Sequence, residues 1–357
     1  MTVLRYLLWP FSILYSTIML LRNWLYDKGW LRSEQFDLPV ISVGNLTVGG
    51  TGKTPHVEYL LRLMTDKKTA VLSRGYRRKS KGFVLADERA TSETLGDEPF
   101  QYHRDFPDAL VAVSESRPAG IAQLLHIQPA MEVVLLDDAM QHRPVRPSLN
   151  LMLTDYGRLF YKDHVLPTGL LREPRQGARR ADAVIVTKCP ADLTQAQLTD
   201  ITRQVHRYSR PDTPVFFSAF RYGNPVGIGN AEELTKRVVL LTGIANAAPL
   251  LRHLTDKGYE VVQHLAFADH YSYTLADLEK LKVLLEQEQG QGLSIITTRK
   301  DAVKLTDRAL AAHTSQLPIF YVPIEVYFLQ QGEAFDALIR QHLRSYEAAK
   351  SIETDKI

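Results

Sequence analysis

The sequence predicts an α/β fold in two domains, and three observations lead to this prediction. Short apolar runs rich in β-branched residues alternate with longer helix-like stretches over almost all of the 357 residues, which is typical of parallel sheets. A turn-rich stretch at residues 221–225 separates an earlier set of runs from a later one. A glycine-rich loop follows the first run directly.

The composition is that of an ordinary globular protein, with 45% apolar and 23% charged residues. The formal net charge is only +3, so we expect no nucleic-acid partner. Cys189 is the single cysteine of the sequence. An intramolecular disulfide and a cysteine-based metal cluster are therefore both excluded.

The chain begins with an apolar stretch that carries no charge from Tyr6 to Leu21. About 16 helical residues span roughly 24 Å, which is short for a hydrocarbon core of about 30 Å. Trp9 and Trp24 favour the headgroup region of a membrane. We expect a membrane-associated helix that dips into the surface, with a helix buried in the protein as the alternative. No small-residue cleavage site follows, which argues against a signal peptide.

The predicted strands fall into two sets. The first set comprises residues 38–43, 69–73, 109–113, 132–136, 149–153, 183–187 and 214–218. The second comprises residues 237–242, 260–265, 294–298 and 319–324. Helices are predicted at residues 56–64, 119–126, 275–287 and 333–344.

These sets define the predicted domain organisation. It consists of an N-terminal membrane-associated helix at residues 1–26, a larger parallel-sheet domain at 27–220, a linker at 221–227, a smaller α/β domain at 228–347 and a polar tail at 348–357.

The glycine-rich loop runs from Thr47 to Thr54 and reads Thr-Val-Gly-Gly-Thr-Gly-Lys-Thr. Its glycines allow successive backbone N–H groups to point at phosphate oxygens without Cβ clashes. Lys53 can reach the β- and γ-phosphates, and the Thr54 hydroxyl can bind Mg²⁺. Thr47 stands where the usual pattern has glycine. The larger domain is thus predicted to be P-loop NTPase-like and to bind a nucleoside triphosphate through Thr47, Val48, Gly49, Gly50, Thr51, Gly52, Lys53 and Thr54.

Polar residues follow the other predicted strands of this domain, and ligands bind beyond the carboxyl ends of parallel strands. Asp137 and Asp138 follow the apolar run at residues 133–136. P-loop proteins hold magnesium with an acid at this place, so we assign these two residues to the metal. The alternative is a pair of aspartates in a surface turn.

Two further segments offer groups for proton transfer. Asp97 lies in Gly-Asp-Glu-Pro, in a turn or at a helix start, where a capping role is the alternative. His270 follows a predicted strand of the smaller domain, where a structural role is the alternative. Two basic clusters, at residues 74–81 and 172–180, suit anionic headgroups or the phosphate of a substrate.

Taken together, these motifs resemble the tetraacyldisaccharide 4'-kinase family, the lipid A 4'-kinases of Gram-negative bacteria. The matching segments are residues 43–55, 73–76, 96–99, 137–143, 171–174, 242–246, 267–271 and 300–302, in order along most of the chain. Two segments depart from the family pattern. Ala139-Met140 replaces a common Gly-Phe, and Arg299 replaces a common Glu. We expect the first departure to affect the loop after Asp138, because alanine does not readily adopt φ > 0.

The resemblance implies ATP-dependent phosphorylation of the 4'-hydroxyl of a lipid A disaccharide 1-phosphate at the cytoplasmic face of the bacterial inner membrane, with ATP and Mg²⁺ as cofactors. It implies a catalytic dyad of Asp97 and His270, assisted by Lys53, with Glu173 in the nucleotide site. It places Asn45, Arg74, Arg117, Gln141 and His142 on the substrate side. The implied partners are the lipid A precursor glycolipid and the inner-membrane surface.

A P-loop GTPase or metallochaperone is the main alternative. GTPases read guanine with Asn-Lys-x-Asp after a strand, whereas Thr187-Lys188-Cys189-Pro190 lacks that aspartate. A non-catalytic membrane adaptor that retains a nucleotide-binding fold is a third reading, which an assay of phosphate transfer to a lipid A precursor would exclude.

Overall fold

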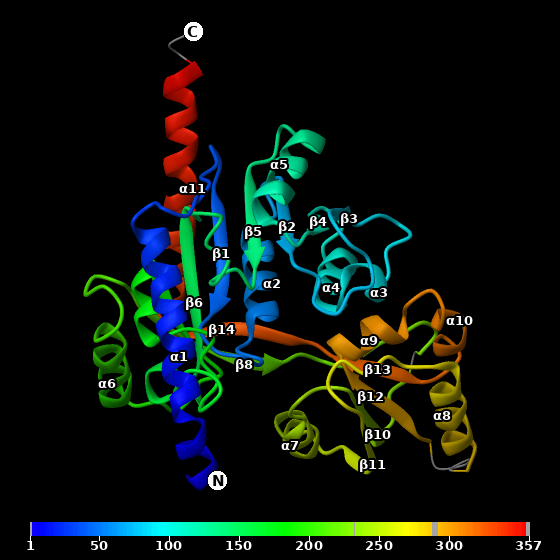
Figure 1. Ribbon diagram of the computed structural model, residues 1–357. Coiled ribbons are helices and arrows are strands. Elements are labelled where there is room, and N and C mark those ends of the chain that lie inside the picture. The colour runs from blue at the N-terminus through cyan, green and yellow to red at the C-terminus, as the bar shows by residue number, and fades with distance from the viewer. Residues whose placement is uncertain (1, 232, 288–291, 355–357) are drawn as a thin grey trace. The chain divides into compact units, whose positions relative to one another are not determined.

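The computed structural model describes residues 2–231, 233–287 and 292–354 (Figure 1). The chain forms two compact units. The first comprises Met1–Arg74, Phe106–Phe220 and Val326–Ile357, and the second comprises Gly75–Asp105 and Arg221–Glu325. This division differs from the predicted domains in two places. The segment Gly75–Asp105 belongs to the second unit, and the chain returns to the first unit at Val326.

The strands of the first unit form one sheet in the order β14-β8-β7-β6-β1-β5-β2-β4. From β8 to β4 all neighbours are parallel. The strands are β1 (Val40–Asn45), β2 (Thr69–Ser73), β4 (Leu110–Val113), β5 (Val133–Asp137), β6 (Leu149–Asp155), β7 (Ala183–Thr187), β8 (Val215–Tyr222) and β14 (Ile324–Gln330). Every residue of β1, β2, β5 and β7 is buried. Burial on both faces explains why these strands read as continuous apolar runs.

The register of the central strands positions the glycine-rich loop. β1 lies between β5 and β6, and Val43 pairs with Asp137. The loop after β1 and the acidic pair after β5 therefore leave the sheet at neighbouring strand ends. Helix α2 (Lys53–Leu63) starts directly after the loop, which confirms the predicted order of strand, loop and helix. The unit also contains α5 (Arg117–Ile127), α6 (Gln195–His206), α11 (Gly332–Thr354) and the short 3₁₀ helices η1 (Phe160–Lys162) and η2 (Arg175–Arg180).

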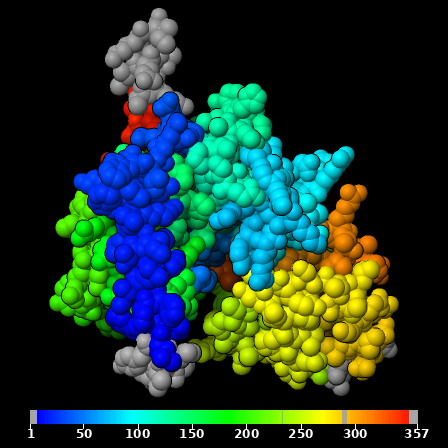
Figure 2. Space-filling model, in the orientation of Figure 1, coloured from blue at the N-terminus to red at the C-terminus, as the bar shows by residue number. Residues whose placement is uncertain are grey.

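Helix α1 (Thr2–Asp27) confirms the predicted N-terminal helix. Two of its polar side chains contact the rest of the unit: Ser12 bonds the Val165 carbonyl and Tyr15 bonds the Arg172 carbonyl. Its apolar side chains face outward, and Figure 2 shows the helix in dark blue on the surface of the molecule. Those more than half exposed include Leu7, Phe11, Ile13, Leu14, Ile18 and Leu21. None of the described helices combines the length and the apolar character that crossing a bilayer requires.

The second unit is built around a smaller sheet in the order β11-β10-β12-β13-β9, parallel except at the β13–β9 pair. The strands of this sheet are β9 (Val226–Gly227), β10 (Arg237–Thr242), β11 (Glu260–Ala266), β12 (Ser294–Thr298) and β13 (Ile319–Val322), and the unit also contains β3 (Val84–Leu85), which is not part of it. Its helices are α3 (Ser92–Leu95), α4 (Asp97–Asp105), α7 (Ala248–Asp256), α8 (Leu275–Gln287), α9 (Arg299–Leu305) and α10 (Ala311–Thr314).

The C-terminal part of the chain differs from the prediction. The predicted strand at residues 319–324 ends at Val322, and a new strand begins at Ile324. Pro323 lies between them and has no N–H to continue the ladder. Helix α11 continues through Thr354, so most of the predicted polar tail is helical.

Candidate active site

The phosphate loop has the backbone that its glycines predict. Gly49 and Gly52 have φ values of 105° and 85°, a region that side chains with a Cβ rarely adopt. A Cβ on Gly52 would also lie 2.6 Å from the ring of Phe220. Thr187 donates to the Thr51 carbonyl at 2.8 Å, and Lys188 donates to the Gly50 carbonyl. The end of β7 thus fixes the loop from outside, a role that we did not predict from the sequence.

Lys53 and Thr54 are the first two residues of α2. The unpaired N–H groups of this helix start favour an anion here. His56, one turn into the helix, lies within 2.7 Å of the Gly52 carbonyl through Nδ1 and within 3.0 Å of Ser218 Oγ through Nε2. Burial lowers the pKa of His56 to about 4, against a smaller opposing effect of its bond to Gly52. The ring is therefore neutral at physiological pH and serves to brace the loop.

The acidic pair lies at the end of β5. Asp137 is its last residue and is buried, and Ser73 donates to its Oδ2 at 3.3 Å. Asp138 adopts φ 50°, so the left-handed residue of this turn is the aspartate itself. Ala139 is not among the positive-φ residues. The positive φ on which we based the expected effect of alanine therefore lies at Asp138 and not at Ala139.

Asp138 is held by two cations. Arg172 donates to its two oxygens at 3.0 and 2.7 Å, and Lys53 Nζ lies 3.6 Å from its Oδ1. Burial acts to raise the pKa of Asp138, but the charge of Lys53 and the hydrogen bond and charge of Arg172 hold it well below its usual range. The carboxylate is therefore ionised at any working pH. Arg172 had been assigned only to a basic cluster.

An oxygen-only donor set of Thr54, Asp137 and Asp138 fits Mg²⁺ chemically, because that ion prefers carboxylates, hydroxyls and water. Within the described residues no group of three or more His, Cys, Asp or Glu side chains forms a complete metal site. A magnesium ion here would therefore depend on the triphosphate and on water for its other ligands.

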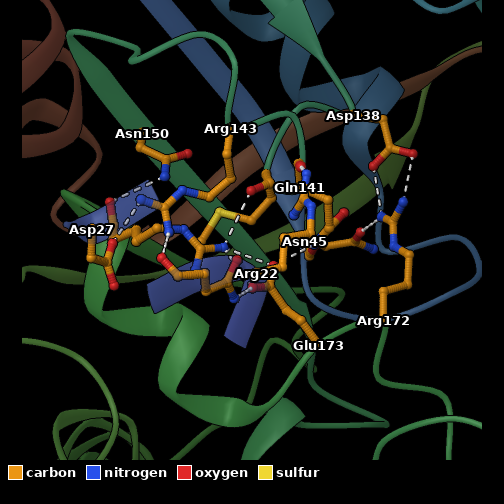
Figure 3. A network of polar contacts seen from close by, with 12 residues as sticks. Arg22, Asp27, Asn45, Asp138, Gln141, Arg143, Asn150, Arg172 and Glu173 are labelled. Carbon is orange, nitrogen blue, oxygen red and sulfur yellow. Dashed lines mark hydrogen bonds and ion pairs between the residues drawn. The ribbon is translucent and has the colours of Figure 1, made fainter. Parts of the chain in front are cut away.

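Beneath the loop lies a buried polar network (Figure 3). Asn45 is fully buried, and it donates to Thr51 Oγ1 at 2.7 Å and accepts from Arg172. Gln141 Nε2 bonds the Asn45 carbonyl at 2.8 Å and Glu173 at 2.9 Å. Glu173 is 1% exposed and also accepts from Arg180 at 2.7 and 2.8 Å.

Four residues with predicted ligand roles have structural contacts of their own. Asn45 and Gln141 belong to the network that holds the loop, and the carboxylate of Glu173 is enclosed by protein donors. The predicted roles of these three residues toward a ligand stay predictions. Arg117 is 1% exposed and donates to the carbonyls of Ser114 and Asp137, so it braces the ends of β4 and β5. A short polar motif in the sequence does not reveal whether its side chains are buried in the protein or face a ligand at the strand end.

Arg74 and His142 keep positions compatible with their predicted place. Arg74 is exposed at the end of β2. Burial, together with the charges of Arg117 and Arg74, lowers the pKa of His142 to about 4. The ring is therefore neutral at physiological pH.

The second unit brings together Asp97 and His270, which are 173 residues apart in sequence. Asp97 is the first residue of α4, as expected for a helix start. His270 Nδ1 lies 2.9 Å from Asp97 Oδ2, and its Nε2 lies 3.2 Å from Lys300 Nζ. Since an ammonium group can only donate, Nε2 accepts from Lys300 and Nδ1 donates to Asp97. The contact with Lys300 thus favours the His270 tautomer that has its proton on Nδ1.

A second lysine of α9 lies near the dyad. Lys304 is 4% exposed at its side chain and lies 3.1 Å from Asp301 and 3.9 Å from Asp97 Oδ2. Burial acts to raise the pKa of Asp97, whereas the bond from His270 and the charges of Lys304 and Lys300 keep it below its usual value. We did not predict either lysine. The available signal was their i, i+4 spacing, which puts both on one face of a short helix.

Comparisons with known proteins agree over nearly the whole chain. The family model described as Tetraacyldisaccharide-1-P 4'-kinase matches residues 4–344. A tetraacyldisaccharide 4'-kinase of Flavobacterium johnsoniae is 44% identical, with 96% of this chain and 98% of that protein covered. One of Phocaeicola vulgatus is 46% identical, with 94% of each covered. A crystal structure of LpxK from Aquifex aeolicus in complex with ATP is similar with a TM-score of 0.73 and 32% identity, covering 95% of this chain and 99% of that one.

Proposed function

The chain belongs to the Tetraacyldisaccharide-1-P 4'-kinase family, and from that premise we propose which of its residues carry out the reaction. It is an ATP-dependent kinase of lipid A biosynthesis that transfers the γ-phosphate of ATP to the 4'-hydroxyl of a lipid A disaccharide 1-phosphate. The observation that carries the residue assignment is the phosphate loop between β1 and α2, with Lys53 at the helix start.

The loop supplies the donor side of the reaction. Backbone N–H groups of the loop from Gly49 onward would surround the phosphates, and Lys53 neutralises charge on the β- and γ-phosphate oxygens as the transferred group separates from ADP. Lys53 and Arg172 share the carboxylate of Asp138. ATP would compete for these cations.

Mg²⁺ would be held by Thr54, Asp137 and Asp138, and when bound it neutralises phosphate charge and favours departure of ADP. The residues contribute an anionic, oxygen-only set, because Asp138 stays ionised next to its two cations. Asp137 is fixed at the end of a buried strand.

Asp97 serves as the general base. It accepts the proton of the 4'-hydroxyl while that oxygen attacks the γ-phosphorus and ADP leaves. His270 orients the carboxylate through its Nδ1–H. The donor loop belongs to the first unit and the dyad to the second.

The acceptor is a glycolipid, and we propose that α1 associates with the membrane surface that contains it. The helix presents its apolar side chains outward, a pattern that soluble proteins rarely leave uncovered. The cytoplasmic face of the bacterial inner membrane is the side where ATP is found. Arg74 and His142 are the proposed contacts to the substrate's polar groups.

Transfer of labelled γ-phosphate to a purified tetraacyldisaccharide 1-phosphate tests the proposal directly. We expect the wild-type chain to label the lipid, excess ATP but not GTP to compete, and Lys53→Met to lose transfer. Competition by GTP with no lipid labelling would instead favour a GTPase. Wild-type transfer by Lys53→Met would refute the assignment of the loop.

A further inference from the structure

Helix α1 contacts more than the surface of the first unit. Tyr15 donates its hydroxyl to the Arg172 carbonyl at 2.9 Å, and Asn23 Nδ2 donates to Glu173 Oε2 at 2.9 Å. The helix therefore binds two consecutive residues of one segment. Asn23 and Glu173 are both buried, so water does not readily replace the lost donor if Asn23 is changed.

The other side of this segment pairs with the beginning of the phosphate loop. Arg172 N donates to the Leu46 carbonyl at 2.7 Å, and Val48 N donates to the Leu170 carbonyl at 2.8 Å. Thr47 and Leu171 form an isolated antiparallel bridge. Residues 170–173 thus lie between α1 and the loop, bonded to both.

The side chains of the segment extend the connection to the phosphate-binding groups, as Figure 3 shows for Arg172 and Glu173. Arg172 bonds Asp138, which also pairs with Lys53. Glu173 accepts from Gln141, whose Nε2 also bonds the Asn45 carbonyl. Asn45 in turn bonds Thr51 of the loop at 2.7 Å. Each link is a hydrogen bond or ion pair within the first unit.

We propose that Tyr15 and Asn23 are positioning residues of the ATP site, so that α1 is a structural part of the phosphate-binding machinery as well as a membrane-associated element. The proposal rests on the assignment of the loop as the ATP site. Asn23 supplies one of the donors that fix the Glu173 carboxylate, and Tyr15 fixes the backbone that carries Arg172. A loop that binds phosphates must be held in place before the ligand arrives.

The protein-facing side of α1 and its exposed apolar side can therefore be tested separately. Arg22 donates to the Gln141 carbonyl at 3.0 Å and Arg143 bonds Asp27 at 2.7 Å, so the last turns of the helix stay attached even without Asn23. Ile18 and Leu14 are on the exposed face. A helix that only associates with the membrane would affect the use of lipid, whereas a positioning helix also affects the use of ATP.

The test measures KM for ATP and KM for the lipid separately in mixed detergent micelles, for Asn23→Leu, Tyr15→Phe and Ile18→Gln. Hydrogen bonds to a charged group contribute enough that Asn23→Leu should raise KM for ATP about tenfold or more. Tyr15→Phe, which removes a neutral bond, should raise it roughly two- to tenfold. Neither should change KM for the lipid, and Ile18→Gln should leave KM for ATP at the wild-type value.

Wild-type KM for ATP in both Asn23→Leu and Tyr15→Phe would overturn the proposal, as would a change confined to KM for the lipid. If Asn23→Leu fails to fold, as judged by its thermal unfolding, Tyr15→Phe decides alone because it removes one oxygen atom. Lys53→Met distinguishes failure of the loop assignment from failure of the proposal for α1. Retained ATP use by that variant would refute the loop assignment itself, whatever the α1 variants show.

Discussion

Asp97, the proposed general base, shows how its surroundings set the ionisation of a single carboxylate. The side chain is largely buried, which alone would favour its neutral form. His270 at 2.9 Å and Lys304 at 3.9 Å reverse that preference, so the group is ionised and able to accept a proton. His270 itself has φ 62°, an uncommon conformation for histidine that occurs at functional sites.

Replacement of Asp97 by asparagine tests its role as base. The amide keeps the size of the side chain but cannot take the proton, so kcat should fall by about 10²–10⁴-fold. Binding of ATP, measured with a fluorescent analogue, should stay within about twofold because the loop belongs to the other unit. Near-normal kcat would reject Asp97 as the base.

Lys300 offers a test through pH. Its positive charge lowers the pKa of Asp97, so Lys300→Met should raise that pKa. The acid limb of kcat/KM reports the essential base of the free enzyme. It should therefore move to higher pH, with activity lost first at low pH and recovered as the pH rises. Lys282→Met, at an exposed lysine of α8, is the matched control and should leave the limb in place. An unmoved limb in Lys300→Met would contradict the proposed coupling.

At the scale of elements, we expect the stability of the junction of β1, the loop and α2 to depend on Gly52 more than on Gly50. Gly52 has φ 85° and contacts Phe220, whereas Gly50 has open space around its Cα and no positive φ. Gly52→Ala should lower the free energy of unfolding by at least about 1 kcal/mol, because a left-handed alanine costs about 1–2 kcal/mol before any clash. Gly50→Ala should stay within about 0.5 kcal/mol. Equal losses in the two variants, measured by chemical denaturation, would contradict the special importance of Gly52 for this junction.

The elements that the sequence predicted well are those whose signal is local. Buried parallel strands such as β2 and β7 appear as short apolar runs, and their predicted limits agree with the structure. Asp97 at a helix start and the phosphate loop are also local patterns. The roles of Asn45, Glu173 and Arg117 were not readable, because burial of a polar side chain depends on partners that are distant in sequence, such as Asn23 and Gln141.

At the scale of the molecule, the chain crosses between its two units more often than a linear reading suggests. Residues 75–105 leave the first unit between β2 and β4 and bring Asp97 to His270. The chain returns after β13 and adds β14 beside β8. Composition changes little at these crossings, so only the turn-rich segment near residue 221 gave a boundary signal. The contact between Asp97 and His270, the proposed dyad, therefore depends on the topology, although each residue was identified from a local motif.

The last prediction concerns the molecule on its membrane. Burial of a leucine or isoleucine side chain away from water contributes about 1.5–3 kcal/mol, so replacing Leu14 and Ile18 together by glutamine should weaken binding to vesicles of anionic phospholipid by about tenfold or more. Co-sedimentation at fixed lipid concentration measures the effect. Val283→Gln is the matched control, since Val283 is a similarly exposed apolar residue on α8. Undiminished binding of the double variant would refute α1 as the membrane-associated surface. Weakened binding with unchanged KM for ATP in micelles would show that the outer face of α1 serves the lipid surface alone.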